Sequence, residues 1–114
     1  MFFKKRRIQM LDNFRSYQLA LQLYRQCRPV HLPYHLKDQL HRAASSIALN
    51  LSEGSAKPTQ KDRQRYYAIA FGSLREVQTI IKLEGLTSIQ VPADNLGAHL
   101  YRLCKGSPPP RPPR

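Results

Sequence analysis

The fold of this chain is decided by residues 38–54, which read DQLHRAASSIALNLSEG. Apolar or small residues recur in and just before this stretch at steps of four and three: Leu36, Leu40, Ala43, Ile47, Leu51 and Gly54. This spacing places them on one face of a helix, which we expect to run from about residue 34 to residue 52. Small side chains at 43–46 allow another helix to approach closely. Gly54 is interpreted as the C-terminal stop, because glycine readily adopts the left-handed conformation that ends many helices.

The segment after this stretch has the same periodicity. A third helix is expected to begin at Thr59, whose side chain forms a variant of the capping box with Asp62. It should end near Glu84, because Gly85 can take the left-handed cap. Its inward stripe contains Tyr67, Ala70, Leu74, Val77 and Ile81.

Two more helices are expected at the ends of this region. The first covers about residues 12–28 and ends at Pro29. Phe14, Tyr17, Leu21 and Tyr24 lie on one apolar face, and Leu19, Leu23 and Cys27 form a second stripe beside it. The last covers about residues 92–104, because Pro92 is tolerated in a first turn, and residues 86–90 are expected to be a linker. The chain is therefore predicted to be all-α, an antiparallel up-down four-helix bundle.

Charge divides the chain into three parts. The chain has 114 residues and a net charge of +12, with 19 Lys plus Arg against 7 Asp plus Glu. Residues 1–10 hold +4, residues 11–104 hold +5 and residues 105–114 hold +3. We expect a basic N-terminal extension over 1–11, in which Met10 is a candidate alternative start, the bundle over 12–104, and a basic Pro-rich tail over 105–114.

Composition excludes several classes of protein. The length suits one domain, and no apolar run approaches the roughly 20 residues that span a bilayer. The first residues contain no apolar segment typical of a secretory signal. Cys27 and Cys104 match no metal or redox spacing, so we expect reduced thiols and a cytoplasmic location. The excess of positive charge favours nucleic acid as a partner over an anionic membrane.

The strongest candidate site is a basic cluster around the start of the third helix. It contains Lys57, Lys61, Arg63 and Arg65, with Asp62 as the only acid. Lys61 and Arg65 lie one helical turn apart, a spacing that suits contacts to phosphates. Tyr66 and Tyr67 could offer stacking surfaces for bases. The alternative is a solvated helix face with both tyrosines packed into the bundle.

A second group of basic residues lies on the first two helices. Its candidate nucleic-acid contacts are Arg15, Arg25, Arg28, Lys37 and Arg42. Asp38 lies four residues before Arg42, so a simple ion pair within the helix is the alternative interpretation for that residue.

Residues 38–54 and 68–76, the latter reading AIAFGSLRE, resemble a family of bacterial four-helix-bundle proteins encoded in intervening sequences of 23S rRNA genes. The family is related to the accessory protein of diversity-generating retroelements. The resemblance implies a positively charged, ring-shaped homo-oligomer, a pentamer, that works with nucleic acid and has a reverse transcriptase or other protein partner. The family's polar signature is matched by Asn50, Glu53, Gly54, Gly72, Ser73 and Glu76. We expect a structural role for these residues, because a buried polar group without a partner costs about 1–3 kcal/mol.

The sequence argues against catalysis. No histidine lies three or four residues after Glu53 or Glu76, so neither carboxylate has a helical histidine partner. His31 and His35 are four residues apart, but Pro33 between them prevents a helical pair of ligands. No glycine-rich phosphate loop is present, so we expect no enzyme activity, no cofactor and no metal.

The first and third helices are apolar over more than one stripe, which favours a homo-oligomer. Our hypothesis is a non-enzymatic nucleic-acid-binding bundle, and the alternative is a protein-interaction scaffold that uses the Pro-rich tail.

Overall fold

A computed structural model of the chain describes residue 11 and residues 14–105. Four helices make up most of this part, and no strand occurs in it. They are α2 (Arg15–Cys27), α3 (Tyr34–Ser55), α4 (Gln60–Glu84) and α5 (Thr87–Lys105). The predicted all-helical class is confirmed. Of the predicted extension over 1–11 only Leu11 is described, and of the predicted tail over 105–114 only Lys105, which is the last residue of α5. The expected helix start at Asp12 lies outside the described residues.

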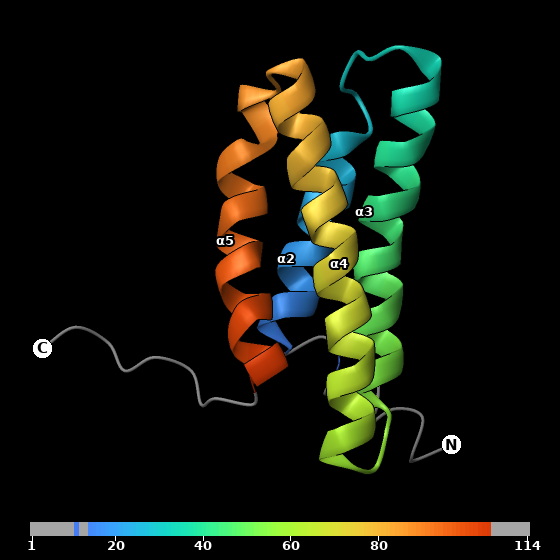
Figure 1. The fold of residues 1–114 in the computed structure, drawn as a ribbon, viewed down its shortest axis with the longest axis vertical. Helices are drawn as coiled ribbons and strands as arrows, with labels where there is room; N and C mark the ends of the chain where they lie inside the picture. Colours follow the sequence, from blue (N-terminus) through green and yellow to red (C-terminus); the bar gives the residue numbers. More distant parts are fainter. Residues whose placement is uncertain (1–10, 12–13, 106–114) are drawn as a thin grey trace, which may run out of the picture.

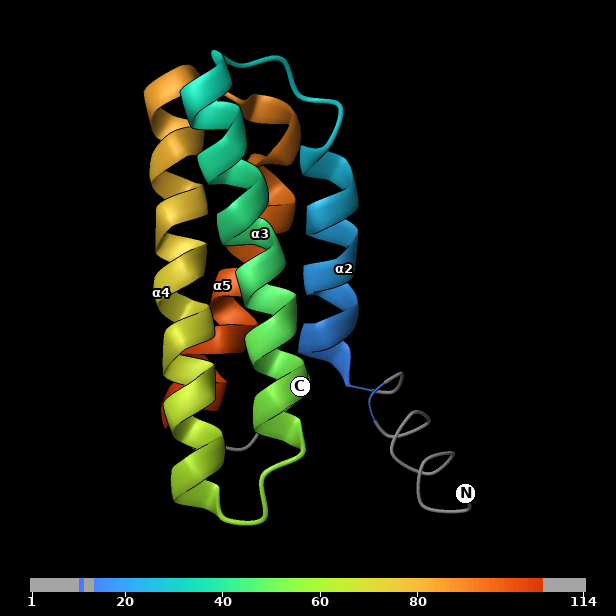
Figure 2. The ribbon, with the colours of Figure 1, turned by 90° about the vertical axis from the view of Figure 1, so that its right-hand side faces the viewer.

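The four helices surround one apolar core. Each packs against two others: α3 against α2 and α4, and α5 against α4 and α2. Successive helices run in opposite directions, so α2 begins, α3 ends, α4 begins and α5 ends at the same end of the molecule (Figure 1). Figure 2 shows α3 between α4 and α2, with α5 behind them. Residues far apart in sequence therefore meet at each end.

The apolar stripes predicted for α3 and α4 form most of this core. On α3, the buried residues include Leu40, Ala43, Ile47, Leu51 and Gly54, while Leu36 is half-buried. On α4, all five residues of the predicted stripe are buried: Tyr67, Ala70, Leu74, Val77 and Ile81. The burial of these residues confirms both predicted stripes. The prediction succeeds because the periodicity of a long helix identifies its inward face well.

The inward face of α2 follows the second of the two predicted stripes, because Leu23 and Cys27 are buried. Its buried residues are Ser16, Ala20, Leu23 and Cys27, whereas Phe14, Tyr17, Leu21 and Tyr24 are half-buried at the margin of the core. Small Ser16 and Ala20 allow close packing, and tyrosine rings fit a margin where their hydroxyl groups reach water. Burial raises the pKa of the Cys27 thiol to about 11.

The prediction that Gly54 ends the second helix is wrong. The helix continues to Ser55, and Gly54 is a buried helical residue. A Cβ atom at Gly54 would lie 2.8 Å from Tyr67 Cε1 and 2.9 Å from Tyr66 Cβ. The glycine is therefore explained by the close approach of α4 and not by a left-handed cap. Gly85 does have the predicted left-handed conformation, with φ of 63°, and its N–H donates to Ile81 O.

The predicted linker over residues 86–90 is also wrong in most of its length. The last helix begins at Thr87, and Pro92 lies inside it. Ile89 is almost completely buried and extends the inward stripe of Ala93, Leu96 and Leu100 by one turn. Proline removes one backbone hydrogen bond near the helix start, and the burial of Ile89 offsets this loss.

Several large apolar side chains remain on the surface. Those with about half or more of their area exposed are Tyr34, Leu49, Ile69, Leu83, Val91 and Tyr101. Within the described part of the chain, none of the helices has the length and apolar character required to cross a membrane.

Candidate nucleic-acid interface

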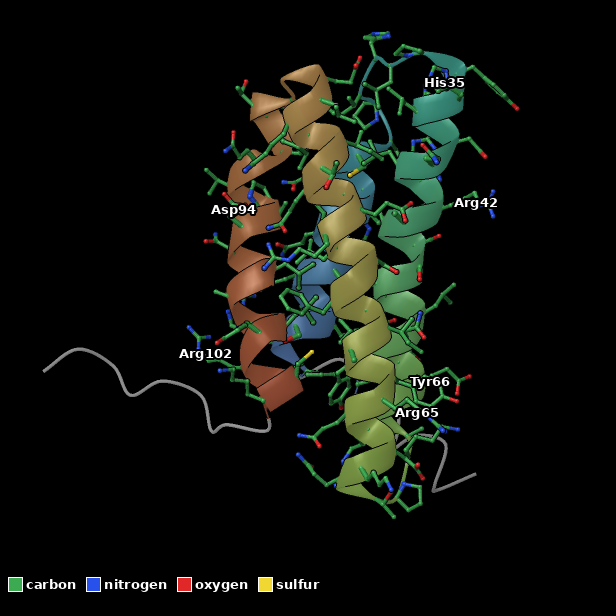
Figure 3. The ribbon with its side chains drawn as sticks, viewed as in Figure 1. His35, Arg42, Arg65, Tyr66, Asp94 and Arg102 are labelled. Carbon is green, nitrogen blue, oxygen red and sulfur yellow. The ribbon has the colours of Figure 1, made fainter. Side chains whose placement is uncertain are left out.

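The predicted basic residues divide between the two ends of the bundle. Lys57, Lys61, Arg63 and Arg65 lie at the end where α4 begins, together with Arg15 at the start of α2. Arg25, Arg28, Lys37 and Arg42 lie in the half where α2 ends and α3 begins. Figure 3 shows Arg65 low on α4 and Arg42 much higher on α3. The structure therefore separates Arg15 from the other members of the second predicted group.

The basic cluster is organised around the ring of Tyr66. Lys57 Nζ lies 5.0 Å from the centre of this ring, and Arg65 Cζ lies 5.8 Å from it. Lys57 also pairs with Glu53 at 3.7 Å, and Arg65 pairs with Asp62 at 3.9 Å. Surface ion pairs of this kind contribute about 0–1 kcal/mol. A phosphate can therefore replace either carboxylate at little cost.

Arg63 has a different role within the same cluster. Its Nη1 donates a hydrogen bond to the backbone carbonyl of Lys57 at 3.0 Å. Thr59 Oγ1 accepts a hydrogen bond from the backbone N–H of Asp62 at 3.2 Å, which confirms the Thr59 half of the predicted capping box. Arg63 thus ties the α3–α4 turn to α4 and positions Lys57, while Lys61 is exposed to solvent.

Tyr67 is packed into the bundle, as in the alternative interpretation, and is not available for base stacking. Its side chain is 8% exposed, and its ring centre lies 6.0 Å from that of Phe14. Cys104 Sγ donates to the Tyr67 carbonyl at 3.4 Å. Burial raises the pKa of Tyr67, and the nearby Arg63 charge partly opposes this effect. Tyr67 therefore joins the starts of α2 and α4 to the end of α5.

We call this end of the bundle the Tyr67 end, and it is strongly basic. Its charged residues are Arg15, Lys57, Lys61, Arg63, Arg65, Arg102 and Lys105, with Glu53 and Asp62 as the acids, a net of +5. The other described residues carry six basic and four acidic side chains, a net of +2. Sequence reasoning missed Arg102 and Lys105, because only the antiparallel arrangement brings the end of α5 to the start of α4.

The polar signature residues are only partly brought together. Ser73 Oγ and Ser46 Oγ are 2.8 Å apart between α4 and α3. Asn50 Nδ2 donates to the Ser46 carbonyl at 2.8 Å and to Ser46 Oγ at 3.1 Å. This network satisfies polar groups where the two helices meet. Sequence reasoning missed Ser46, although its spacing of four residues from Asn50 was a usable signal.

The remaining signature residues lie outside this network. Gly72 is exposed and has open space around its Cβ position. Glu53 and Glu76 are also exposed. Arg42 pairs with Asp38 at 3.8 Å, as in the alternative interpretation, and both side chains are largely exposed.

His99 makes folding stability sensitive to pH at the Tyr67 end. Burial, then the charges of Arg102 and Arg15, lower its pKa below the ordinary value of 6.5. The folded protein thus binds a proton at His99 less readily than the unfolded chain does. The His99 contribution to stability is complete above pH 6.5 and is lost as the pH falls toward the folded-state pKa.

We therefore expect the free energy of unfolding to fall as the pH is lowered below about 6.5, as measured by urea denaturation at several pH values. His99→Gln should reduce this dependence. The control, His35→Gln, changes an exposed histidine near the opposite end and should retain the wild-type dependence. An unchanged pH dependence in His99→Gln would contradict the assignment.

Comparison with known families supports the resemblance seen in the sequence. The sequence model of the family described as "23S rRNA-intervening sequence protein" matches residues 13–104. No curated protein and no solved structure matches the chain significantly. The family match covers all four helices except the last residue of α5. The chain belongs to the 23S rRNA-intervening sequence protein family.

Proposed function

We propose that this protein is a non-enzymatic nucleic-acid-binding bundle that holds the phosphate backbone of RNA or DNA at its Tyr67 end. The observation that carries the proposal is the placement of +5 of the described net charge of +7 at that end. Lys and Arg contacts to phosphate position a protein on nucleic acid but carry no sequence code. We therefore propose binding with little sequence preference.

A salt titration of the wild-type protein tests this function. Each phosphate contact adds about −0.7 to −0.9 to the slope of log K against log salt concentration. Binding to generic RNA or DNA should therefore weaken steeply between about 50 and 200 mM salt. Fluorescence anisotropy with a labelled oligonucleotide measures this slope. Absence of binding at the lowest salt concentration would contradict the proposal.

We also propose that the protein assembles into a ring-shaped homo-oligomer, which the family resemblance makes a pentamer. The support is apolar surface on neighbouring helices: Leu49 on α3 is 66% exposed, and Ile69 on α4 is 49% exposed. Burial of such side chains against another copy would remove them from water. Light scattering tests the proposal, and the mass of a single chain at micromolar concentration would contradict it.

The cellular role proposed here is an accessory one in the cytoplasm. The family description refers to intervening sequences of 23S rRNA, which agrees with a role in RNA metabolism. A reverse transcriptase or other protein partner is the further component that the resemblance suggests. Co-purification of RNA with the tagged protein, with and without nuclease treatment, tests whether such a partner is held directly or through nucleic acid.

A further inference from the structure

Two aromatic rings and two cations form a strip on the face where α4 and α5 lie side by side (Figure 1). Phe71 on α4 and Tyr101 on α5 pack edge to face, with their ring centres 6.4 Å apart and their planes at 72°. Arg75 Cζ lies 4.9 Å from the centre of the Phe71 ring, and Lys105 Nζ lies 4.7 Å from the centre of the Tyr101 ring. We call these four residues the α4–α5 strip.

The strip begins at the Tyr67 end and leads away from it. Because α4 and α5 run in opposite directions, the two cations lie on opposite sides of the aromatic pair along the bundle. Each cation follows its aromatic neighbour by four residues, which is about 6 Å along the helix axis. Lys105 therefore lies at the Tyr67 end, whereas Arg75 lies near the middle of α4.

Both cations of the strip are exposed and available to an anion. In the described part of the chain, neither Arg75 nor Lys105 pairs with a carboxylate. Arg75 Nη1 donates to Gln78 Oε1 at 3.2 Å, and Gln78 Nε2 in turn donates to Asp94 Oδ1 at 3.2 Å. The Gln78 amide, and not the Arg75 guanidinium, therefore contacts Asp94. The charge of Arg75 is left for a phosphate, which a guanidinium can bind while it stacks on a ring.

Tyr101 has the exposure that base stacking requires. It is 48% exposed, whereas Tyr67 is 8% exposed. The Phe71 ring, which is half-buried, fixes the Tyr101 ring from one side. Lys105 covers the Tyr101 ring, but a cation–π contact at an exposed position is weaker than the stacking of a base on an aromatic ring. A phosphate that draws Lys105 away therefore leaves the Tyr101 ring to a base.

We propose that the α4–α5 strip binds single-stranded nucleic acid, with a base stacked on Tyr101 and the flanking phosphates held by Lys105 and Arg75. This inference rests on the proposed function and deepens it, because stacking on a protein ring selects unpaired bases over a duplex. The strand crosses the Tyr67 end and continues over the strip toward the middle of the bundle. Ile69, which supports the proposed assembly, precedes Phe71 by two residues and thus lies on another side of α4.

Tryptophan fluorescence of the full chain tests the stacking contact, because the wild-type sequence contains no tryptophan. Tyr101→Trp keeps an aromatic ring at the strip. Its fluorescence should be quenched when the protein is titrated with an oligothymidylate, a single-stranded DNA, because the indole ring stacks on a base. Tyr34→Trp is the control, since Tyr34 is 87% exposed and begins α3 at the opposite end. Its fluorescence should not change.

The affinity of Tyr101→Ala gives a second readout. It should bind the oligothymidylate about 5- to 100-fold more weakly than wild type, the loss expected for one base stacked on a ring. The salt slope should stay as in wild type, because an uncharged ring contributes no counterion release. A duplex of the same length keeps its bases paired, so its binding should fall by no more than about twofold. Tyr34→Ala should bind both probes as wild type does.

Anisotropy measures these affinities, while circular dichroism and light scattering check the helices and the assembly. Wild-type affinity in Tyr101→Ala and an unquenched Tyr101→Trp would overturn this inference and leave the proposed function in place. Equal losses on oligothymidylate and duplex would overturn it as well, because phosphate contacts alone would then hold the strand. A changed oligomeric mass in Tyr101→Ala would overturn it by assigning the strip to an interface between copies. Failure of wild type to bind would overturn both.

Discussion

Replacement of Lys57, Lys61 and Arg65 by glutamine should weaken nucleic-acid binding by roughly 100-fold near 0.1 M salt and reduce the salt slope by about 2 to 3. The reason is that each cation contributes one phosphate contact and releases one counterion on binding. Arg63 is left intact because its hydrogen bond to the Lys57 carbonyl positions the turn. Replacement of Arg63 would change binding through both the structure of the turn and the loss of charge, and the two effects could not be separated.

The matched control for this variant replaces Arg25, Arg28 and Arg42, which are exposed and lie in the opposite half. With glutamine at these three positions, the control loses the same charge of +3. Its affinity should stay within about threefold of wild type, because salt at this concentration screens charges that are far from the binding site. Isothermal titration or anisotropy measures both proteins in the same buffer. Similar losses in the two variants would contradict a site localised at the Tyr67 end.

Gly54→Ala is expected to destabilise the protein by about 1–3 kcal/mol. The added Cβ would meet Tyr66 Cβ at 2.9 Å and Tyr67 Cε1 at 2.8 Å. Rotation of the Tyr66 ring cannot move its own Cβ, so α3 and α4 must separate. The same movement would displace the Tyr66 ring, and we therefore expect weaker nucleic-acid binding as a second consequence.

Gly72→Ala is the control, because a Cβ at Gly72 meets nothing within 4 Å. Alanine in the interior of an exposed helix is favoured over glycine by about 0.5–1 kcal/mol, so this variant should be more stable than wild type. Urea denaturation of both variants gives the comparison. A Gly54→Ala protein as stable as Gly72→Ala would show that α3 and α4 do not approach as closely as described.

The two central helices could be predicted well because their signal is long and regular. The four-and-three spacing over residues 36–54 on α3 and 67–81 on α4 identifies both the helix and its buried face. Gly54 was misinterpreted because a glycine near a helix end has two explanations. One is a left-handed cap and the other is close helix contact, and the positions of Tyr66 and Tyr67 distinguish them.

Proline and aromatic residues caused the other errors. Proline is common in the first turn of a helix, so Pro92 indicated that the last helix begins there. The helix in fact begins one turn earlier, and Ile89 in that turn is buried. Spacing alone could not tell which of the two apolar stripes of α2 faces inward, because tyrosines at a core margin satisfy the same spacing. The basic residues at 57–65 could be found because they are close in sequence. Arg15, Arg102 and Lys105 could not be added to that site without the antiparallel topology.

The most direct test of one-ended binding is acetylation of lysines in the wild-type protein, with and without a bound oligonucleotide, followed by mass spectrometry. Lys57, Lys61 and Lys105 lie at the Tyr67 end, whereas Lys37 and Lys82 lie at the opposite end and serve as internal controls. Bound nucleic acid should protect the first three lysines and leave Lys37 and Lys82 as reactive as in the free protein. Protection of Lys37 and Lys82 with no change at Lys57, Lys61 and Lys105 would contradict the account.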